Sequence, residues 1–532
     1  MRRRALLIGL DGATFTILDR LIEQGIMPFL QNLLGAGTRA ELISVVPPLT
    51  PPAWTSLTTG RRPGNHGIFD FMRLESRADG RYLQVSDSRA VSCETIWSIA
   101  TRHGLRATVL NFPLTYPAPP ISGYVVPGWV PWRHLRLACH PADLYDRIRQ
   151  LPGFDARELA MDMSLEGRAL EGPLQADDYE HLINLHIRRE RQWLTVLRHL
   201  MKEQPCELTA ILFDGVDKLQ HFCWRFLDPA LYPASPSPME AKIRNLCLEY
   251  FREIDRFLEE IVTRSGSEAT VVIASDHGFG ATTEIFYVNA WLHQQGYLHW
   301  IDAAQPERNH RETLGLETMA RRFYAVDWDR TVAYCPTPSS NGIYFSLPKQ
   351  AGAVTAQYQE LRRTLIASLL GFTDPATGRP VVTRVWTREE AFAGTHMGAA
   401  PDLTLRLRDG GFVSILPSDV VLKPRSEPAG THRPQGIFVA MGPGIRRGAS
   451  VPALSILDIA PTLLYALGLP VPADFEGRVP QHIFERSYIE ANPVVRAAPT
   501  RVLDDTERAV GTMDTELETE VIKQLKALGY LE

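Results

Sequence analysis

The segment VVIASDHGFG, residues 271–280, constrains the fold of this chain more than any other stretch. It begins with apolar and β-branched residues, reaches Asp276 and His277, and continues into glycines. A short apolar run of this kind is typical of a strand buried on both faces of a parallel sheet. In open α/β sheets, ligands bind beyond the carboxyl ends of the strands, where this aspartate and histidine lie. An isolated Asp-His pair is as often structural as functional, so the choice between these two interpretations depends on motifs elsewhere in the chain.

Length and composition limit the number of lobes and the class of protein that this chain can form. A chain of 532 residues exceeds the roughly 250–300 residues that one hydrophobic core supports, so more than one lobe is expected. Apolar residues make up 45% and charged residues 22%, as in ordinary soluble globular proteins. The net charge of −5 gives no sign of a nucleic-acid-binding or anionic-membrane-binding surface.

The cysteines and the amino terminus exclude further classes. The 6 cysteines have no CxxC spacing, which indicates buried thiols rather than a zinc ribbon or a disulfide framework. The apolar stretch after Met1-Arg2-Arg3-Arg4 is too short for a signal peptide, and no run reaches the roughly 20 residues of a membrane span. We therefore expect a cytoplasmic protein.

Two further strand-like segments end in acidic residues. Residues 5–10 precede Asp11, and residues 207–213 precede the sequence DGVDKLQHFCW, which contains Asp217 and His221. Because Asp217 and His221 are four residues apart, one helical turn would place both on one face, where they can bind one ion. Each feature alone has a commoner explanation: Asp11 as a turn or helix cap, and D-x-x-x-H as coincidence. Their positions after buried strands place them at the same sheet edge as the first pair.

A short helix is predicted within the segment 45–71. Thr50 precedes Pro51, and Gly60 ends the pattern; threonine at the N-cap, proline in the first turn and glycine after the last turn are typical of a helix. Thr50 either caps this helix or presents its hydroxyl beside unpaired N–H groups and the positive end of the helix dipole. The second arrangement suits an anion and a developing alkoxide.

One more histidine precedes a predicted strand. His432 lies on a glycine-rich loop in GTHRPQGIFVAMGPG, directly ahead of a strand at 436–441. The triplet GTH also occurs at 394–396, so only the strand that follows distinguishes His432. Helical periodicity predicts helices at 15–34 and 241–264.

We predict an α/β fold with a discontinuous core and a cap. The core, residues 1–280 and 426–480, would contain a central, mostly parallel sheet flanked by helices, with a lid-like insertion at 129–200. A smaller α/β cap lobe at 281–425 would contact the substrate, and 481–532 would form a tail and a C-terminal helix. Within the insertion, a basic cluster is expected to be a solvated helix face rather than a ligand set: His181, His186, Arg188, Arg189 and Arg191.

The chain thus contains three carboxylates, three imidazoles and one hydroxyl that a parallel sheet could bring together. These residues are Asp11, Thr50, Asp217, His221, Asp276, His277 and His432. Imidazole and carboxylate ligands in this number suit two zinc ions or similar divalent metal ions. Two dications against three carboxylates leave a local surplus of about one positive charge, which would attract a phosphate.

The order of these motifs resembles the alkaline phosphatase superfamily, and within it the type I phosphodiesterase and nucleotide pyrophosphatase group. The motifs are LIGLDG, TPPAWTSLTTG with RRPGNHGI, D-x-x-x-H, SDHG, and GTH ahead of a strand that ends in GPG. The resemblance covers about 1–120, 207–280 and 430–470, and weakly the last helix, near 516–528. It implies an alkaline-phosphatase-like core and a two-metal phosphodiesterase or phosphohydrolase acting on a small-molecule phosphate ester.

The resemblance also implies roles for the site residues. Thr50 would be the nucleophile and form a phosphothreonine intermediate. One metal ion would activate its hydroxyl, and the other would stabilise the leaving oxygen. The ligands of the first ion would be Asp11, Asp276 and His277, together with Thr50. The ligands of the second ion would be Asp217, His221 and His432. Two zinc ions are expected, and manganese would also fit.

The sequence departs from the group at one position. Nucleotide pyrophosphatases of the group usually carry an asparagine that contacts a phosphate oxygen a few residues after HGI, and this chain has Phe71 there, beside Asp70. Asn65 and Asn111 are candidate substitutes. The departure weakens the case for a nucleotide substrate. A sulfatase is disfavoured because Thr50 does not lie in the C-x-P-x-R motif that sulfatases of the superfamily need.

Two alternatives stay open. A phosphotransferase or phosphomutase would use the same site with an alcohol in place of water, and the cap lobe would select that alcohol. A non-catalytic binding protein with the same fold would be expected to have lost at least one of the seven residues, and none is lost. The identity of the leaving group and the oligomeric state are not indicated.

Overall fold

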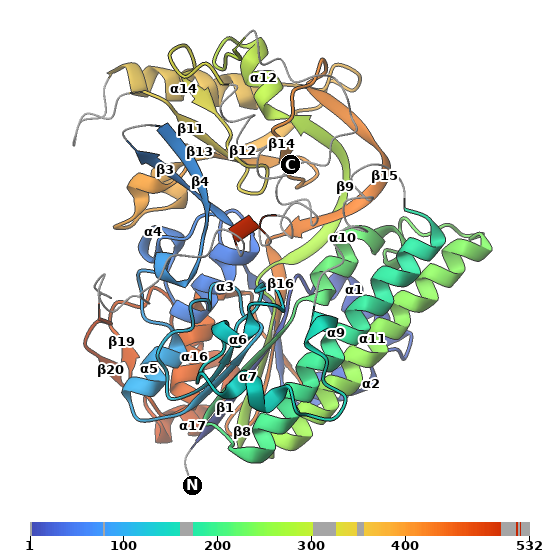
Figure 1. Ribbon diagram of the computed structural model, residues 1–532, viewed down its shortest axis with the longest axis vertical. Coiled ribbons are helices and arrows are strands. Elements are labelled where there is room, and N and C mark those ends of the chain that lie inside the picture. Colours follow the sequence, from blue (N-terminus) through green and yellow to red (C-terminus); the bar gives the residue numbers. More distant parts are fainter. Residues whose placement is uncertain are drawn as a thin grey trace.

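A computed structural model describes residues 3–77, 80–159, 174–301, 326–347, 356–501, 518, 519 and 522. A core lobe is built around a nine-stranded sheet, and a smaller lobe lies above it in Figure 1. In sheet order the strands are β17 (Ala449–Ser450), β2 (Thr38–Ile43), β16 (Gln435–Met441), β8 (Ala269–Ala274), β1 (Arg4–Leu10), β7 (Leu208–Phe213), β5 (Ala107–Leu110) and β6 (Gly123–Val126), and β18 (Leu454–Ser455) pairs with β2.

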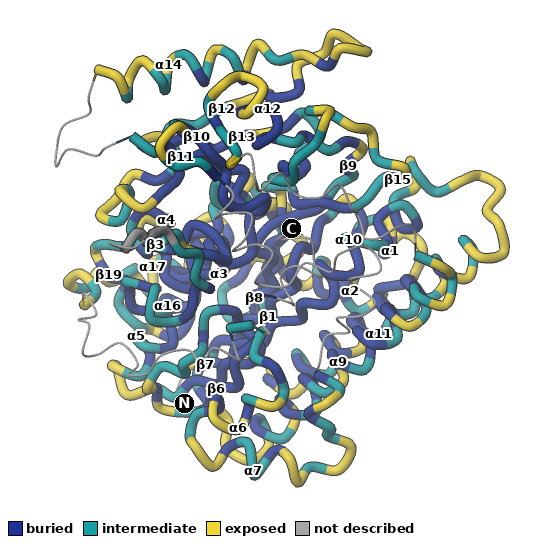
Figure 2. Tube along the Cα trace, turned by 45° about the horizontal axis from the view of Figure 1, so that its top comes forward, coloured by how far each residue is buried: buried dark blue, intermediate teal, exposed yellow. Residues whose placement is uncertain are grey.

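The centre of the sheet is parallel. Strands β8, β1, β7, β5 and β6 pair in parallel, and β16 runs antiparallel to β8 and β2. Every residue of β7 and β8 is buried, as Figure 2 shows for the middle of the core lobe. This burial explains the continuous apolar runs, because both faces of a parallel sheet are covered. The predicted α/β fold with a mostly parallel sheet is confirmed.

Alternating side chains of β1 enter two separate cores. Leu6, Ile8 and Leu10 pack with one set of helices, and Ala5 and Leu7 pack with the other. The first set is α1 (Phe15–Glu23), α2 (Pro28–Ala36), α9 (Ala176–Glu203), α10 (Gly215–Leu227) and α11 (Pro238–Ser265). The second set is α3 (Thr50–Thr59), α5 (Ile96–Arg102) and α16 (Ile459–Ala466). The sheet is therefore flanked by helices on both faces (Figure 1).

The smaller lobe has its own sheet and its own core. Its four strands are, in order, β10 (Ala333–Tyr334), β11 (Gly342–Phe345), β13 (Leu403–Leu407) and β12 (Val382–Thr387), packed with α12 (Val288–Gln294) and α14 (Ala356–Gly371). Two strands join the lobes: β9 (Gly278–Tyr287) leaves the core and β15 (Leu422–Arg433) returns antiparallel to it, and β14 (Val413–Ser414) also pairs with β9. The exact domain boundaries stay a prediction.

The remaining elements are short. They are α4 (Pro63–His66), β3 (Met72–Arg77), β4 (Gly80–Val85), η1 (Ser88–Ala90), α6 (Leu135–Ala138), α7 (Leu144–Ile148), η2 (Ala156–Leu159), α15 (Arg388–Ala391), η4 (Met397–Ala399), η5 (Ile456–Asp458), β19 (Val471–Pro472), η6 (Gln481–Ile483), α17 (Arg486–Ala491) and β20 (Arg496–Ala497). The predicted C-terminal helix falls mostly outside the described residues. Within the described part, no helix is long and apolar enough to cross a bilayer.

Local predictions differ from the structure in three places. The single helix predicted at 15–34 is two helices, because Gly25 takes a left-handed conformation (φ 68°) and Pro28 starts a new helix. His432 lies within strand β15 rather than on a loop. The basic face of α9 is not uniformly solvated, since His186 is 0% and Arg189 4% exposed. The cysteine prediction holds, because all six are buried free thiols.

Candidate metal and catalytic site

Two aspartates are brought side by side by the register of neighbouring strands. Gly9 of β1 pairs with Ala274 of β8, and Asp11 and Asp276 each lie two residues further along. The backbone N–H of Gly12 donates to Asp276 Oδ1 at 3.2 Å, and both carboxylates are 1% exposed. The register of two parallel strands is thus sufficient to make an acidic pair at the sheet edge.

These two carboxylates are short of partners. Asp11 Oδ1 and Asp276 Oδ2 are buried and accept no hydrogen bond from any residue that the structure describes. Burial, followed by the neighbouring charges of Asp276 and Asp217, raises the pKa of Asp11. Burial and the charge of Asp217 also raise the pKa of Asp276, although its hydrogen bonds oppose the shift. A buried anionic oxygen without a donor is costly, and a cation would remove that cost. The residues therefore fit a metal ion.

Thr50 lies next to this pair. It is the first residue of α3, with Leu49 as the N-cap, so the prediction that Thr50 is itself the N-cap is wrong by one position. Its hydroxyl Oγ1 lies 3.3 Å from His277 Nε2, and the residue is 0% exposed. His277 Nε2 also lies 3.2 Å from Asp276 Oδ2, so the imidazole stands between the Thr50 hydroxyl and the acidic pair.

The start of α3 offers an anion fewer donors than a typical helix terminus. Pro51 and Pro52 have no amide hydrogen, and the N–H of Ala53 donates to the carbonyl of Leu49 at 2.9 Å. Of the first four residues, Thr50 alone can offer its N–H to a ligand. This helix start therefore lacks the expected row of unpaired N–H groups. The positive end of the helix dipole would still attract an anion here.

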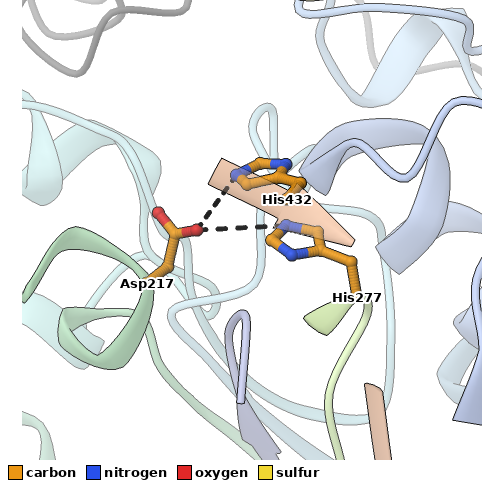
Figure 3. A group of neighbouring side chains, drawn as sticks. All are labelled: Asp217, His277 and His432. Carbon is orange, nitrogen blue, oxygen red and sulfur yellow. Dashed lines mark ion pairs between the residues drawn. The ribbon is translucent and has the colours of Figure 1, made fainter. Parts of the chain in front are cut away.

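A second group of predicted ligands comes from α10 and β15. Asp217 and His221 lie on one face of α10, with His221 Nε2 at 3.5 Å from Asp217 Oδ2. His432 Nε2 lies 3.2 Å from Asp217 Oδ1 and 3.2 Å from His221 Nε2. Figure 3 shows the carboxylate of Asp217 pointing toward the rings of His432 and His277, which are stacked at 3.6 Å. The helix and the returning strand therefore converge on the strand tips.

All three imidazoles present the same nitrogen to the centre. Each Nδ1 lies beside a backbone carbonyl oxygen: His277 with Gly278 at 3.2 Å, His221 with Gly430 at 3.2 Å and His432 with Pro48 at 2.9 Å. Because a carbonyl only accepts, Nδ1 carries the proton and each Nε2 directs a lone pair inward. Burial lowers the pKa of His277 and lowers that of His221 to about 4, which favours the neutral ring. This is how histidines that bind metal ions are usually oriented.

The structure brings all seven predicted residues together. Two buried groups each have their potential ligand atoms within 4.8 Å of one another: Asp11, Asp276 and His277 in one, and Asp217, His277 and His432 in the other. His277 belongs to both groups, and His221 adjoins the second. Two such groups are consistent with a binuclear metal centre. How the ligands divide between two ions stays a prediction.

Other candidate residues lie elsewhere. His396, of the second GTH triplet, contacts the backbone of Gly64 rather than either ligand group. Asn65 donates to Glu476 at 3.0 Å, and Phe71 stacks on Trp129 with ring centroids 5.1 Å apart. None of these contacts involves a predicted ligand.

Sequence reasoning missed the buried charges at the start of α10. Asp214 and Lys218 form a buried ion pair and lie on either side of the predicted ligand Asp217 in the sequence. Asn111 donates to Asp214 Oδ1 at 3.3 Å. The signal was present in DGVDKLQH, where Asp214 and Lys218 have the same four-residue spacing as Asp217 and His221.

Comparisons with known proteins identify the family and the fold. The family model described as type I phosphodiesterase / nucleotide pyrophosphatase matches residues 5–434. A search of curated protein sequences found no match.

Among solved structures, murine ectonucleotide pyrophosphatase / phosphodiesterase 5 is 14% identical, with a TM-score of 0.53 over 91% of this chain and 100% of that chain. The human form is 15% identical, with a TM-score of 0.53 and the same coverage of 91% and 100%. Phosphonoacetate hydrolase from Sinorhizobium meliloti 1021, in complex with phosphonoformate, is 18% identical, with a TM-score of 0.52 over 88% and 95%. At these identities the similarity demonstrates the fold.

The family match extends over most of the chain and includes every predicted ligand. It confirms the resemblance inferred from the motif order. The chain belongs to the type I phosphodiesterase / nucleotide pyrophosphatase family of metal-dependent enzymes, within the alkaline phosphatase superfamily.

Proposed function

We propose that this enzyme hydrolyses a small-molecule phosphate ester at a two-metal site, with Thr50 as the nucleophile. The observation that carries the proposal is the orientation of the imidazoles: His221, His277 and His432 all direct Nε2 toward buried carboxylates. Lone pairs and anionic oxygens in one buried space repel one another unless cations lie between them. The family provides the second support, because its members act on phosphate esters.

The residues divide into a nucleophile and two ligand sets. Thr50 would attack phosphorus, since its hydroxyl lies beside both ligand groups and is held at the start of a helix. Asp11, Asp276 and His277, with Thr50, would hold one ion. Asp217, His221 and His432 would hold the other. Bound divalent ions would lower the pKa of the Thr50 hydroxyl and neutralise the departing oxygen.

The donor set favours zinc. Imidazole nitrogens and carboxylate oxygens in three- or four-ligand groups are typical zinc ligands, and manganese accepts the same atoms. A carboxylate-only site would instead favour magnesium or calcium. We therefore expect two zinc ions, with manganese as the second choice.

One experiment tests the proposal. Metal content of the purified protein is measured by elemental analysis, together with nitrophenol release from bis(p-nitrophenyl) phosphate and p-nitrophenyl phosphate, with and without chelator. We expect about two ions per chain and turnover that the chelator abolishes and zinc or manganese restores. The preferred ester separates a diesterase from a monoesterase. Absence of both bound metal and turnover after adding either metal would overturn the proposal.

A further inference from the structure

A cluster of buried polar side chains surrounds the first turn of α10, the helix that carries Asp217 and His221. We call it the α10 anchor; its members are Asn111, His186, Arg189, Glu190, Asp214, Lys218 and Tyr250. They come from the end of β5, from α9, from α10 and the residue before it, and from α11. None is more than 4% exposed. Burial of this many charges is costly, so their arrangement needs a physical explanation.

Asp214 is held from three sides. Lys218, one turn later in α10, forms an ion pair with it, and Arg189 Nη1 donates to Asp214 Oδ1 at 3.2 Å. Asn111 donates to the same oxygen at 3.3 Å. Burial opposes ionisation of this carboxyl, but the two cations outweigh it and hold its pKa below the ordinary value. Asp214 therefore connects α10 to both α9 and the end of β5.

Glu190 holds the next residue. Its Oε1 accepts the backbone N–H of Gly215 at 2.8 Å and the hydroxyl of Tyr250 at 3.1 Å. The fit is close, because a Cβ at position 215 would lie 2.6 Å from Glu190 Oε1 and 2.7 Å from the Tyr250 hydroxyl. Through Glu190, the first residue of α10 is tied to α9 and α11. Two acids thus set the position of the start of this helix.

The two ligand groups differ in their dependence on this anchor. Asp217 and His221 follow the anchored residues within one and two turns of α10. Asp11 and Asp276 are set by the pairing of β1 with β8, and their side chains have no hydrogen bond to the anchor among those found in the described residues. Helix α10 reaches the loop after β1 through Gln220, which is not part of the anchor and donates to the carbonyl of Gly12 at 2.9 Å. A shift of α10 would therefore move one ligand group relative to the other.

We infer that Glu190 and Asp214 are positioning residues that set the affinity of one metal ion, the one held by Asp217, His221 and His432, without touching it. The inference rests on the proposed two-metal site and adds to it a site-selective role for residues outside the ligand set. Residues behind metal ligands typically change metal affinity by about 10- to 100-fold when altered. The anchor would act through the position of α10, with the other ion unaffected.

The chain offers a matched control. Asp255 of α11 accepts the backbone N–H groups of Phe29 at 2.9 Å and Leu30 at 2.8 Å, at the start of α2. It is 4% exposed, so it is a buried acid that holds a helix start in the same way as Glu190. Helix α2 carries no proposed ligand. Asp255→Ala should therefore cost stability without affecting metal binding.

The test is stepwise zinc titration of the full-length apo-protein against a competing chelating dye, repeated with manganese. We expect Glu190→Ala to raise the Kd of one of the two ions at least about tenfold and that of the other less than threefold. Glu190→Gln should stay within threefold for both ions, because the amide oxygen still accepts from Gly215. Asp255→Ala should also stay within threefold for both.

Double variants identify which of the two ions Glu190→Ala affects. In an Asp276→Asn background, Glu190→Ala should weaken the remaining ion, whereas in a His432→Ala background it should have no further effect. If Glu190→Ala does not fold, Gly215→Ala takes its place, since its Cβ would displace Glu190 and Tyr250. Equal weakening of both ions, no weakening, or the same pattern in Asp255→Ala would overturn the inference. A wild-type protein that binds no metal would instead overturn the proposed function, and the inference with it.

Discussion

The two ligand groups are adjacent but are built in different ways. The strand-tip group, Asp11 and Asp276 with His277, extends directly from β1 and β8, whose parallel pairing sets the two aspartates opposite each other. The predicted helix group combines Asp217 and His221 of α10 with His432 of β15, which lies more than 200 residues further along the chain. One group depends on a pair of neighbouring strands, and the other depends on how distant elements pack.

This difference determines which parts of the molecule can disturb each group. The strand tips are supported by the centre of the sheet, where every residue of β8 is buried. The helix group relies on the α10 anchor and on β15, which returns from the smaller lobe paired with β9. We therefore expect distant changes to reach the helix group first.

Removal of the proposed nucleophile, Thr50, should give the largest effect and leave both ligand groups intact. Thr50→Ala should reduce turnover at least about 10³-fold, because the attacking oxygen is lost. Metal content should stay near that of the wild type, since the hydroxyl is one ligand among several. Turnover and elemental analysis of the same preparation provide the test. Loss of both ions in this variant would contradict the division of roles.

Ligand substitutions should separate the two groups. Asp276→Asn should weaken one ion at least about 100-fold and His432→Ala the other, each leaving the second ion bound. Titration of each variant with zinc would measure both constants. If either substitution removed both ions together, the two groups would have to be treated as a single cooperative site.

Asp70 tests the connection between the lobes. Ser339 Oγ donates to Asp70 at 2.6 Å and the hydroxyl of Thr337 also donates to it, so a buried core acid holds a segment between β10 and β11. Burial raises the pKa of Asp70 to about 6. A raised pKa means that the folded state binds the proton more tightly, so the contribution of Asp70 to stability is largest below pH 4 and falls as the pH rises through 6.

The measurement compares the wild type with Asp70→Asn by urea unfolding between pH 4 and pH 7. The stability advantage of the wild type should shrink by up to about 3 kcal/mol over this range, which corresponds to about two pKa units. An advantage that grows with pH would show that the carboxylate, rather than the acid, is the form that the contact favours.

The smallest expected difference between the strand-tip group and the helix group is the number of protons that each releases when it binds a metal ion. Because the pKa values of Asp11 and Asp276 are raised, we expect the strand-tip group to release protons when it binds an ion at neutral pH. In the helix group, burial lowers the pKa of His221 to about 4, which favours the neutral ring. The neighbouring imidazoles hold the pKa of Asp217 below its ordinary value, although burial alone would raise it. His221 and Asp217 therefore already have the protonation states that bind a metal ion. Calorimetry in buffers of different ionisation enthalpy measures the difference. Equal release from both ions would remove the contrast.

Much of the fold followed from local patterns in the chain. The apolar runs before Asp11 and Asp276 are β1 and β8, as expected for strands covered on both faces. The glycine that ends α3 takes the left-handed conformation, with Gly60 at φ 65°. These features depend on a few neighbouring residues, which is why the sequence alone indicates them.

Features that depend on distant partners were harder to predict. The periodicity of α9 does not reveal that His186 and Arg189 are buried, because that depends on where α10 and α11 pack. The role of Glu190 is likewise invisible in the sequence, since its partner Gly215 lies 25 residues away on another element. A side chain's burial is a property of its surroundings rather than of its own segment.

Chain order and strand ends thus determined the α/β fold and the residues of the site, because a parallel sheet gathers its carboxyl ends at one edge. Packing determined the rest: which imidazole nitrogen faces inward, how close the two ligand groups lie, and what holds α10 in place. These are set by contacts between residues far apart in the chain, with geometry that spacing along one segment does not encode. For this protein, the identity of the predicted ligands follows from local sequence, whereas the geometry of the site follows from tertiary packing.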